Sequence, residues 1–151
     1  MSGQADSTFR TPALALVLAV LAFAVTGCGD LSKDELNRGV ESLSALAAQG
    51  QLVASGVARD ATKSTYARVM AKTLGGEAEH EAEKLADATP EEGTEEERDA
   101  AVAVAGEISQ LFSELQTFPG DERHGALVQR HLKQAQEKAE AITARLNGEK
   151  A

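Results

Sequence analysis

The chain has 151 residues, with 24 acidic against 15 basic side chains and a formal net charge of −9. A chain with this acidic excess is poorly suited to binding nucleic acid, because proteins bind nucleic acid through basic side chains that neutralise phosphates. A single cysteine excludes a disulfide framework within the chain and any cysteine-clustered zinc or iron–sulfur site.

The first element of the chain is an apolar stretch from Ala13 to Val25 that contains no charged residue. Its length is typical of the hydrophobic region of a secretory signal peptide and falls short of the ~20 residues that span a bilayer. Arg10 is the only basic residue before it. We therefore expect residues 1–27 to be a cleaved signal peptide. The alternative is an ordinary core helix.

The apolar stretch ends in Val25-Thr26-Gly27-Cys28, an aliphatic residue and two small ones before the cysteine. This sequence resembles the lipobox of bacterial lipoproteins. The resemblance implies that Cys28 receives a diacylglyceryl group through a thioether bond and becomes the first residue after cleavage. It also implies an extracytoplasmic protein attached to a membrane by its lipid, with residues 28–31 as the lipidated cysteine and a short linker.

The remaining chain is rich in good helix formers and lacks the alternation of β-strands, which predicts an all-α fold. Breaks are expected at Asp60 to Thr65, at Pro90 with Gly93, and at Pro119-Gly120. One long helix through the first break is the alternative. The predicted helices span 32–59, 63–88, 94–117 and 122–147. Their similar lengths indicate an up-down-up-down four-helix bundle over 32–147, with 148–151 as a tail.

Three helix starts carry capping signals. Ser32 with Glu35, and Thr94 with Glu97, fit the capping box, in which a hydroxyl and a carboxylate accept hydrogen bonds from first-turn N–H groups. Asp121 is expected to cap the last helix.

Apolar residues repeat every three or four positions in each predicted helix, which indicates one buried stripe per helix. In the first two helices the stripes comprise Leu36, Val40, Leu43, Leu46, Ala47, Gly50, Val53, Ala54 and Val57, then Tyr66, Val69, Met70, Leu74, Ala78 and Leu85. In the last two they comprise Ala101, Val104, Ile108, Leu111, Leu115 and Phe118, then Val128, Leu132, Ala135, Ala139, Ile142 and Leu146. Gly75-Gly76 is expected to weaken or bend the second helix.

The candidate site lies on the second helix, beside the double glycine. Glu77 and Glu81 project onto the side of its apolar stripe, with His80 between them. Such a group could bind a cation or a basic partner segment, or act as an acid/base pair; the alternative is that both acids face water. Glu77 and His80 also match the Glu-x-x-His pair of di-metal bundles, but the looser copy at Asp121 and His124 lies roughly 20 Å away along the bundle. No metal site is expected.

The sequence contains no nucleophile–base arrangement, P-loop, dinucleotide fingerprint or EF-hand loop. We therefore expect no catalytic residues and no cofactor. The favoured function is a non-enzymatic, membrane-anchored helical bundle that contacts another envelope protein or acts as a spacer, without nucleic acid. The alternative is a binding module for a metal cation or small cationic ligand. The sequence leaves the oligomeric state open.

Overall fold

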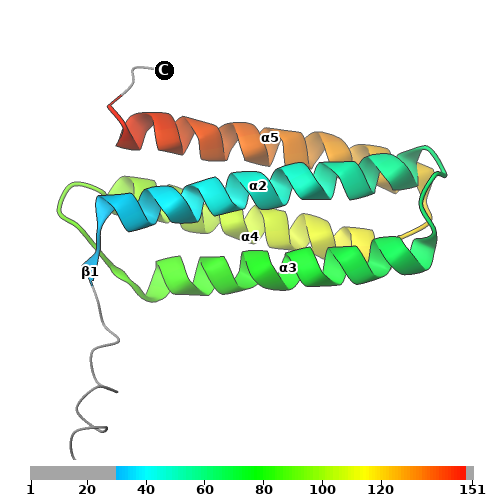
Figure 1. Cartoon of the computed structure of the whole chain (residues 1–151), viewed down its shortest axis with the longest axis horizontal. Coiled ribbons are helices and arrows are strands. Elements are labelled where there is room, and N and C mark those ends of the chain that lie inside the picture. Colours follow the sequence, from blue (N-terminus) through cyan, green and yellow to red (C-terminus); the bar gives the residue numbers. More distant parts are fainter. Residues whose placement is uncertain (1–29, 149–151) are drawn as a thin grey trace, which may run out of the picture.

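The computed structural model describes residues 30–148, which form a bundle of four antiparallel helices (Figure 1). The helices are α2 (Lys33–Ala58), α3 (Ser64–Asp87), α4 (Glu95–Thr117) and α5 (Glu122–Leu146). Short turns reverse the chain between consecutive helices, which confirms the predicted all-α up-down-up-down bundle. None of the helices within residues 30–148 is long and apolar enough to cross a membrane. The predicted signal peptide, its lipobox and Cys28 lie outside the described residues.

The predicted break between the first two helices is present. The helix α2 ends at Ala58, and Asp60 adopts a left-handed conformation with a φ of 51° before α3 begins. Asp tolerates this region because its short polar side chain can bond locally. The double glycine does not interrupt α3, which is a continuous helix from Ser64 to Asp87.

Two of the three predicted caps are confirmed. The Ser32 hydroxyl accepts from the Glu35 N–H while the Glu35 carboxylate accepts from the Ser32 N–H, which completes the capping box. The Asp121 carboxylate accepts from the His124 N–H at 2.9 Å.

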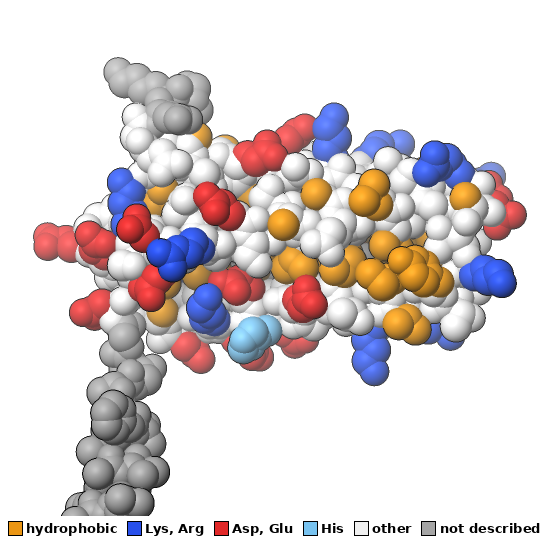
Figure 2. Space-filling model, in the orientation of Figure 1, with side chains coloured by type: hydrophobic (Ala, Val, Ile, Leu, Met, Phe, Trp, Pro, Cys, Tyr) orange, Lys and Arg blue, Asp and Glu red, His pale blue; other side chains and the backbone are white. Residues whose placement is uncertain are grey.

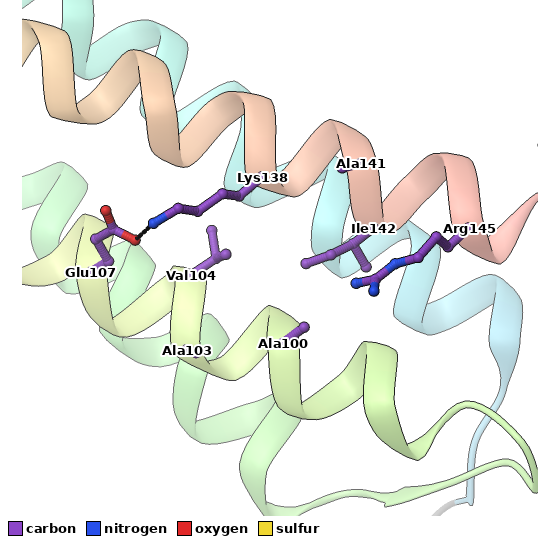
Figure 3. A pocket seen from close by; sticks show the side chains of 8 residues that line it. All are labelled: Ala100, Ala103, Val104, Glu107, Lys138, Ala141, Ile142 and Arg145. Atoms are coloured by element: carbon purple, nitrogen blue, oxygen red, sulfur yellow. Dashed lines mark hydrogen bonds and ion pairs between the residues drawn. The ribbon is translucent and has the colours of Figure 1, made fainter. Parts of the chain in front are cut away.

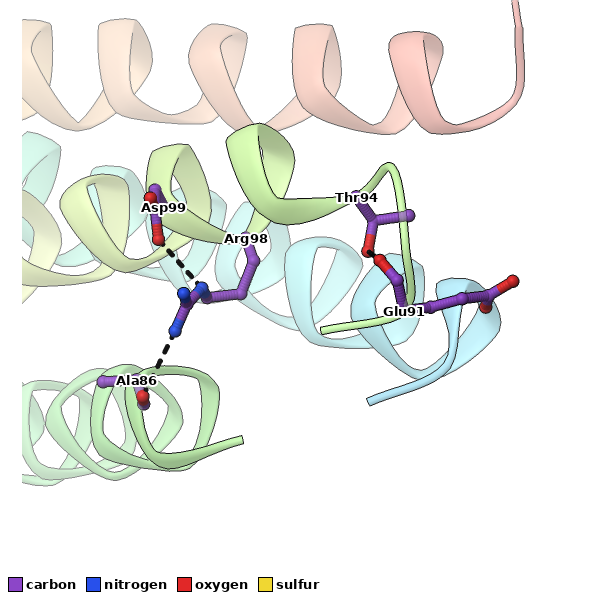
Figure 4. Close-up of polar contacts among 5 residues, drawn as sticks. All are labelled: Ala86, Glu91, Thr94, Arg98 and Asp99. Carbon is purple, nitrogen blue, oxygen red and sulfur yellow. Dashed lines mark hydrogen bonds and ion pairs between the residues drawn. The ribbon is translucent and has the colours of Figure 1, made fainter. Parts of the chain in front are cut away.

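The predicted cap at Thr94 is wrong. Its hydroxyl instead donates backwards to the carbonyl of Glu91 at 2.8 Å (Figure 4). The reason is the tight turn before α4, in which Gly93 has a φ of +87° and its N–H donates to the carboxylate of Glu95. A threonine held in that turn cannot direct its hydroxyl toward the next helical turn.

Two short strands join the N-terminal segment to the α3–α4 connection. β1 (Asp30–Leu31) pairs in parallel with β2 (Thr89–Pro90). Leu31 is buried in the core although the sequence predicts a linker there. The first described residues are therefore already part of the bundle, two residues beyond Cys28.

The core follows most of the predicted stripes, with three corrections. Tyr66 and Val69 are 55% and 58% exposed, and Phe118 is 43% exposed. On α3 the buried stripe passes instead through smaller residues, including Ala67 and Ala71. Small side chains there let α3 lie close to its neighbours, and this turns the larger ones outward.

The largest fully buried side chain, Phe112, was not part of the predicted stripe. A Cβ placed on Gly50 of α2 would lie 2.5 Å from the ring of Phe112, and one on Gly75 of α3 would lie 3.2 Å from the Cβ of Phe112. The ring therefore fills the space beside Gly50, while Gly75 lets the Cβ of Phe112 lie close to α3.

The four helices form two close pairs, α2 with α5 and α3 with α4. At the α2–α5 contact a Cβ on Gly125 would lie 2.7 Å from the backbone nitrogen of Ala58 and 3.0 Å from the carbonyl oxygen of Ala54. Backbone cannot yield as a flexible side chain can, so this approach requires glycine.

Candidate functional site

The three candidate residues on α3 do not form a common site. Glu77 and His80 are exposed, whereas the side chain of Glu81 is only 13% exposed and lies between α3 and α2. A Cβ on Gly39 of α2 would lie 2.8 Å from Glu81 Oε1, so the glycine leaves room for that carboxylate. Glu81 Oε1 lies 3.2 Å from Lys84 Nζ in an ion pair. The predicted pair of inward carboxylates is thus reduced to one, which already has a partner.

Within residues 30–148 no group of three or more His, Asp or Glu side chains is placed to hold a metal ion. The other histidines lie apart from the candidate residues. The ring of His124 stacks on Phe118 with centroids 4.2 Å apart, and His131 is exposed. Residues 30–148 therefore contain no candidate metal centre.

The N-terminal segment is fastened to the bundle by Glu91. Its carboxylate accepts a hydrogen bond from the Lys33 N–H at 2.8 Å, and its own N–H donates to the carbonyl of Leu31 at 3.0 Å. The α3–α4 connection thereby fixes the point at which the chain enters the bundle. We call the end of the bundle that contains residue 30 the entry end, and the opposite end, with turns 59–63 and 118–121, the far end.

The base of α4 is tied to α3 near the same end. Arg98 donates from its guanidinium to the carbonyl of Ala86 at 3.2 Å (Figure 4). Arg98 Nε also lies 2.8 Å from Asp99 Oδ1, but this ion pair lacks the alignment of a hydrogen bond, and Nε has no hydrogen-bond partner among the described residues. We regard the contact with Ala86 as the one that positions the side chain.

Charge is separated along the bundle. When each helix is divided at its midpoint, the entry half has 17 acidic and 6 basic side chains, whereas the far half has 5 acidic and 7 basic ones. The entry half comprises 30–45, 76–106 and 134–148, and the far half comprises 46–75 and 107–133. Figure 2 shows Asp and Glu side chains crowded at the left, near the entry end, and Lys and Arg side chains at the right.

Among residues 30–148, the large exposed apolar side chains all belong to the far half. They are Leu52, Tyr66, Val69, Phe118 and Leu127. Leu52 is 76% exposed near the end of α2, and Tyr66 and Val69 are in the antiparallel start of α3. Figure 2 shows hydrophobic side chains gathered over the far halves of α2 and α3. We call Leu52, Tyr66 and Val69 the far patch.

A shallow groove of about 430 Å³ lies between α4 and α5 in the entry half (Figure 3). Its floor is apolar and includes Ala100, Val104 and Ile142. At its rim Lys138 Nζ lies 2.6 Å from Glu107 Oε2. Because these two charges pair with each other, the groove offers apolar contact rather than an acid–base pair.

Sequence reasoning missed the role of Glu91 and the far patch. Glu91 is one of several acids near the start of α4, and its contact with Lys33 spans 58 residues of sequence. The far patch did leave a signal. Ala67, Ala71, Leu74 and Ala78 follow one another at intervals of four, three and four residues, and this regular stripe leaves Tyr66 and Val69 outside.

Comparison with known proteins adds no assignment: no family model, curated protein or solved structure matches the chain. The class that the structure defines is therefore a four-helix bundle, and its function is argued from the residues alone.

Proposed function

We propose that the chain is a membrane-anchored extracytoplasmic lipoprotein whose helical bundle is a non-enzymatic module for contact with another envelope protein. The lipid anchor rests on the lipobox-like Val25-Thr26-Gly27-Cys28. Two or more acyl chains on Cys28 would give stable membrane attachment, since each buried CH₂ contributes ~0.8 kcal/mol.

The position of the chain entry supports this proposal. Asp30 pairs with Thr89 of the α3–α4 connection, and Leu31 is buried and bonded to the same connection. Only Gly29 separates Cys28 from the first described residue. An anchor at Cys28 therefore holds the entry end next to the lipid surface and leaves the far end accessible to partners.

The far patch is the observation that carries the contact function. Three large apolar side chains, each more than half exposed, lie on the half of the bundle that is remote from the entry. Exposed apolar residues that gather together mark interaction surfaces more often than isolated ones do. Because the far half has an excess of basic side chains, we propose a partner surface that is apolar and acidic.

The cation-binding alternative has no observation in its favour. Glu77 and His80 are exposed and form no common site with Glu81, which is paired with Lys84. We therefore propose no ligand for these residues.

Photo-crosslinking in the host cell tests the contact function. A photoreactive amino acid is placed at Val69 in the full chain, and a matched one at Gln110, an exposed polar position on α4. We expect Val69 to capture one envelope protein through an acidic peptide, Gln110 to capture none, and Cys28→Ala to abolish the capture. Equal capture from both positions, or capture that persists in the Cys28→Ala variant, would contradict the proposal.

A further inference from the structure

The outward side of α3 carries a charge pattern that is complementary to itself. Arg68, Lys72, Gly76, Glu79 and Glu83 are all exposed and follow one another at intervals of four, four, three and four residues. At 100° per residue these positions form a single stripe along the helix. We call these five residues the α3 outer stripe.

The stripe is symmetric about the middle of its helix. The midpoint of α3 falls between residues 75 and 76. Arg68 and Glu83 lie equally far from it on opposite sides, as do Lys72 and Glu79. Figure 2 shows the same change along the lower edge of the molecule, where α3 lies, from acidic side chains at the left to basic ones at the right.

The charges of the stripe are not satisfied within the bundle. None of Arg68, Lys72, Glu79 and Glu83 forms an ion pair with another residue in 30–148. Arg68 and Lys72 are instead like charges four residues apart, as are Glu79 and Glu83, and such spacing destabilises a helix. A monomer gains nothing from this order of charges.

The centre of the stripe is open to a close neighbour. A Cβ on Gly76 would meet nothing within 4 Å, so no packing inside the bundle requires glycine there. The exposed positions in the middle of the adjacent α4 are also uncharged, namely Gly106, Gln110 and Ser113.

We propose that the protein forms a two-fold symmetric dimer in which the α3 outer stripes of two copies pack antiparallel. A two-fold axis at the midpoint of α3 places Arg68 opposite Glu83 of the partner subunit and Lys72 opposite Glu79 of the partner subunit, each pair twice. The same patch on both copies makes the contact, as in the commonest class of homodimer. Gly76 of each copy lies at the centre, where the missing side chain lets the two helices approach. This dimer does not require the lipid anchor. Val69 of the far patch directly follows Arg68 and lies at the edge of the α3 outer stripe, so the second copy would border the far patch.

Sedimentation equilibrium of the full chain, in a density-matched detergent, tests the dimer. We expect a dimer at low ionic strength whose dissociation constant rises as salt screens the four pairs. The variant Arg68→Glu with Lys72→Glu has an all-acidic stripe, and Glu79→Lys with Glu83→Lys has an all-basic one. Each variant alone should associate roughly tenfold more weakly or worse, because exposed attractive pairs become repulsive. A mixture of the two variants should form the heterodimer.

Two further variants separate this contact from general charge and folding effects. Arg123→Glu with Arg130→Glu makes the same change of net charge on exposed positions of α5 and should leave the dimer intact. Gly76→Gln should keep the helical circular dichroism but weaken the dimer, since a side chain then occupies the centre. A wild-type monomer at low salt, or a dimer that survives both stripe reversals, would overturn the proposal.

Discussion

The carboxylate of Glu91 and the backbone N–H of Lys33 are joined by a 2.8 Å hydrogen bond that links the α3–α4 connection to the first turn of α2. Together with the bond from Glu91 N–H to the carbonyl of Leu31, it makes the start of the folded body part of the bundle. An anchor at Cys28 would therefore pull on a fixed end rather than on a loose tether.

Replacing Glu91 should loosen this end of the molecule alone. Glu91→Gln weakens a charge-assisted bond, and we expect a local loss of up to about 1 kcal/mol. Hydrogen exchange of the Lys33 amide should become faster while amides in the middle of α5 keep their rates. The adjacent exposed acid provides the control, since Glu92→Gln should change neither. Unchanged exchange at Lys33 in Glu91→Gln would show that the bond does not hold the segment.

The contact between α2 and α5 should be intolerant of a single methyl group. In Gly125→Ala the new Cβ meets the backbone of Ala54 and Ala58, and overpacking of this kind costs about 1–3 kcal/mol. Gly106→Ala is the matched control, because a Cβ there meets nothing within 4 Å and alanine improves helix propensity by up to ~1 kcal/mol. Urea unfolding should therefore give opposite signs for the two substitutions, and equal signs would contradict the close approach.

Phe112 lies within α4, and Phe118 is at the C-terminal end of the same helix. Replacing each of them by alanine should cost very different amounts of stability. Phe112 is fully buried, so Phe112→Ala should cost about 3–5 kcal/mol. Phe118 is 43% exposed and stacks on His124, so we expect Phe118→Ala to cost less than about 1.5 kcal/mol. Thermal unfolding of both variants measures the difference, and similar losses would place Phe118 in the core after all.

Acid should weaken the bundle through its caps. Hydrogen bonds from the Ser32 hydroxyl and N–H lower the pKa of Glu35 below 4.5, and the His124 N–H lowers the pKa of Asp121 below 3.8. The unfolded chain binds protons at these two groups more readily than the native chain does. The two carboxylates therefore stabilise the native state at pH values above their ordinary pKa values. This stabilisation is lost as the pH falls through the lower native pKa values. Asp121→Asn keeps an acceptor for the cap but does not titrate, so the free energy of unfolding should depend less on pH in this acid range. An unchanged pH dependence would contradict the role of Asp121.

Much of the architecture is predictable because helix ends and apolar stripes are local signals. The break before α3 and the caps at Ser32 and Asp121 depend on residues within a few positions of each other. The cap at Thr94 failed because the preceding turn, with Gly93, directs the hydroxyl backwards.

What could not be predicted depends on contacts between distant parts of the chain. The sequence shows an apolar residue at Phe112 but does not show that Gly50 leaves space for its ring and Gly75 for its Cβ. In the same way, Glu81 enters the α2–α3 contact because Gly39 is opposite, and this separates it from Glu77. The sequence therefore predicts a group of residues at the candidate site that helix packing does not bring together.

The most direct test of the proposed anchor is mass spectrometry of the N-terminal peptide of the protein purified from its host membranes. We expect the mature chain to begin at Cys28 and to carry the mass of a diacylglyceryl group on that residue. A chain that retains residues 1–27 with an unmodified Cys28 thiol would contradict it.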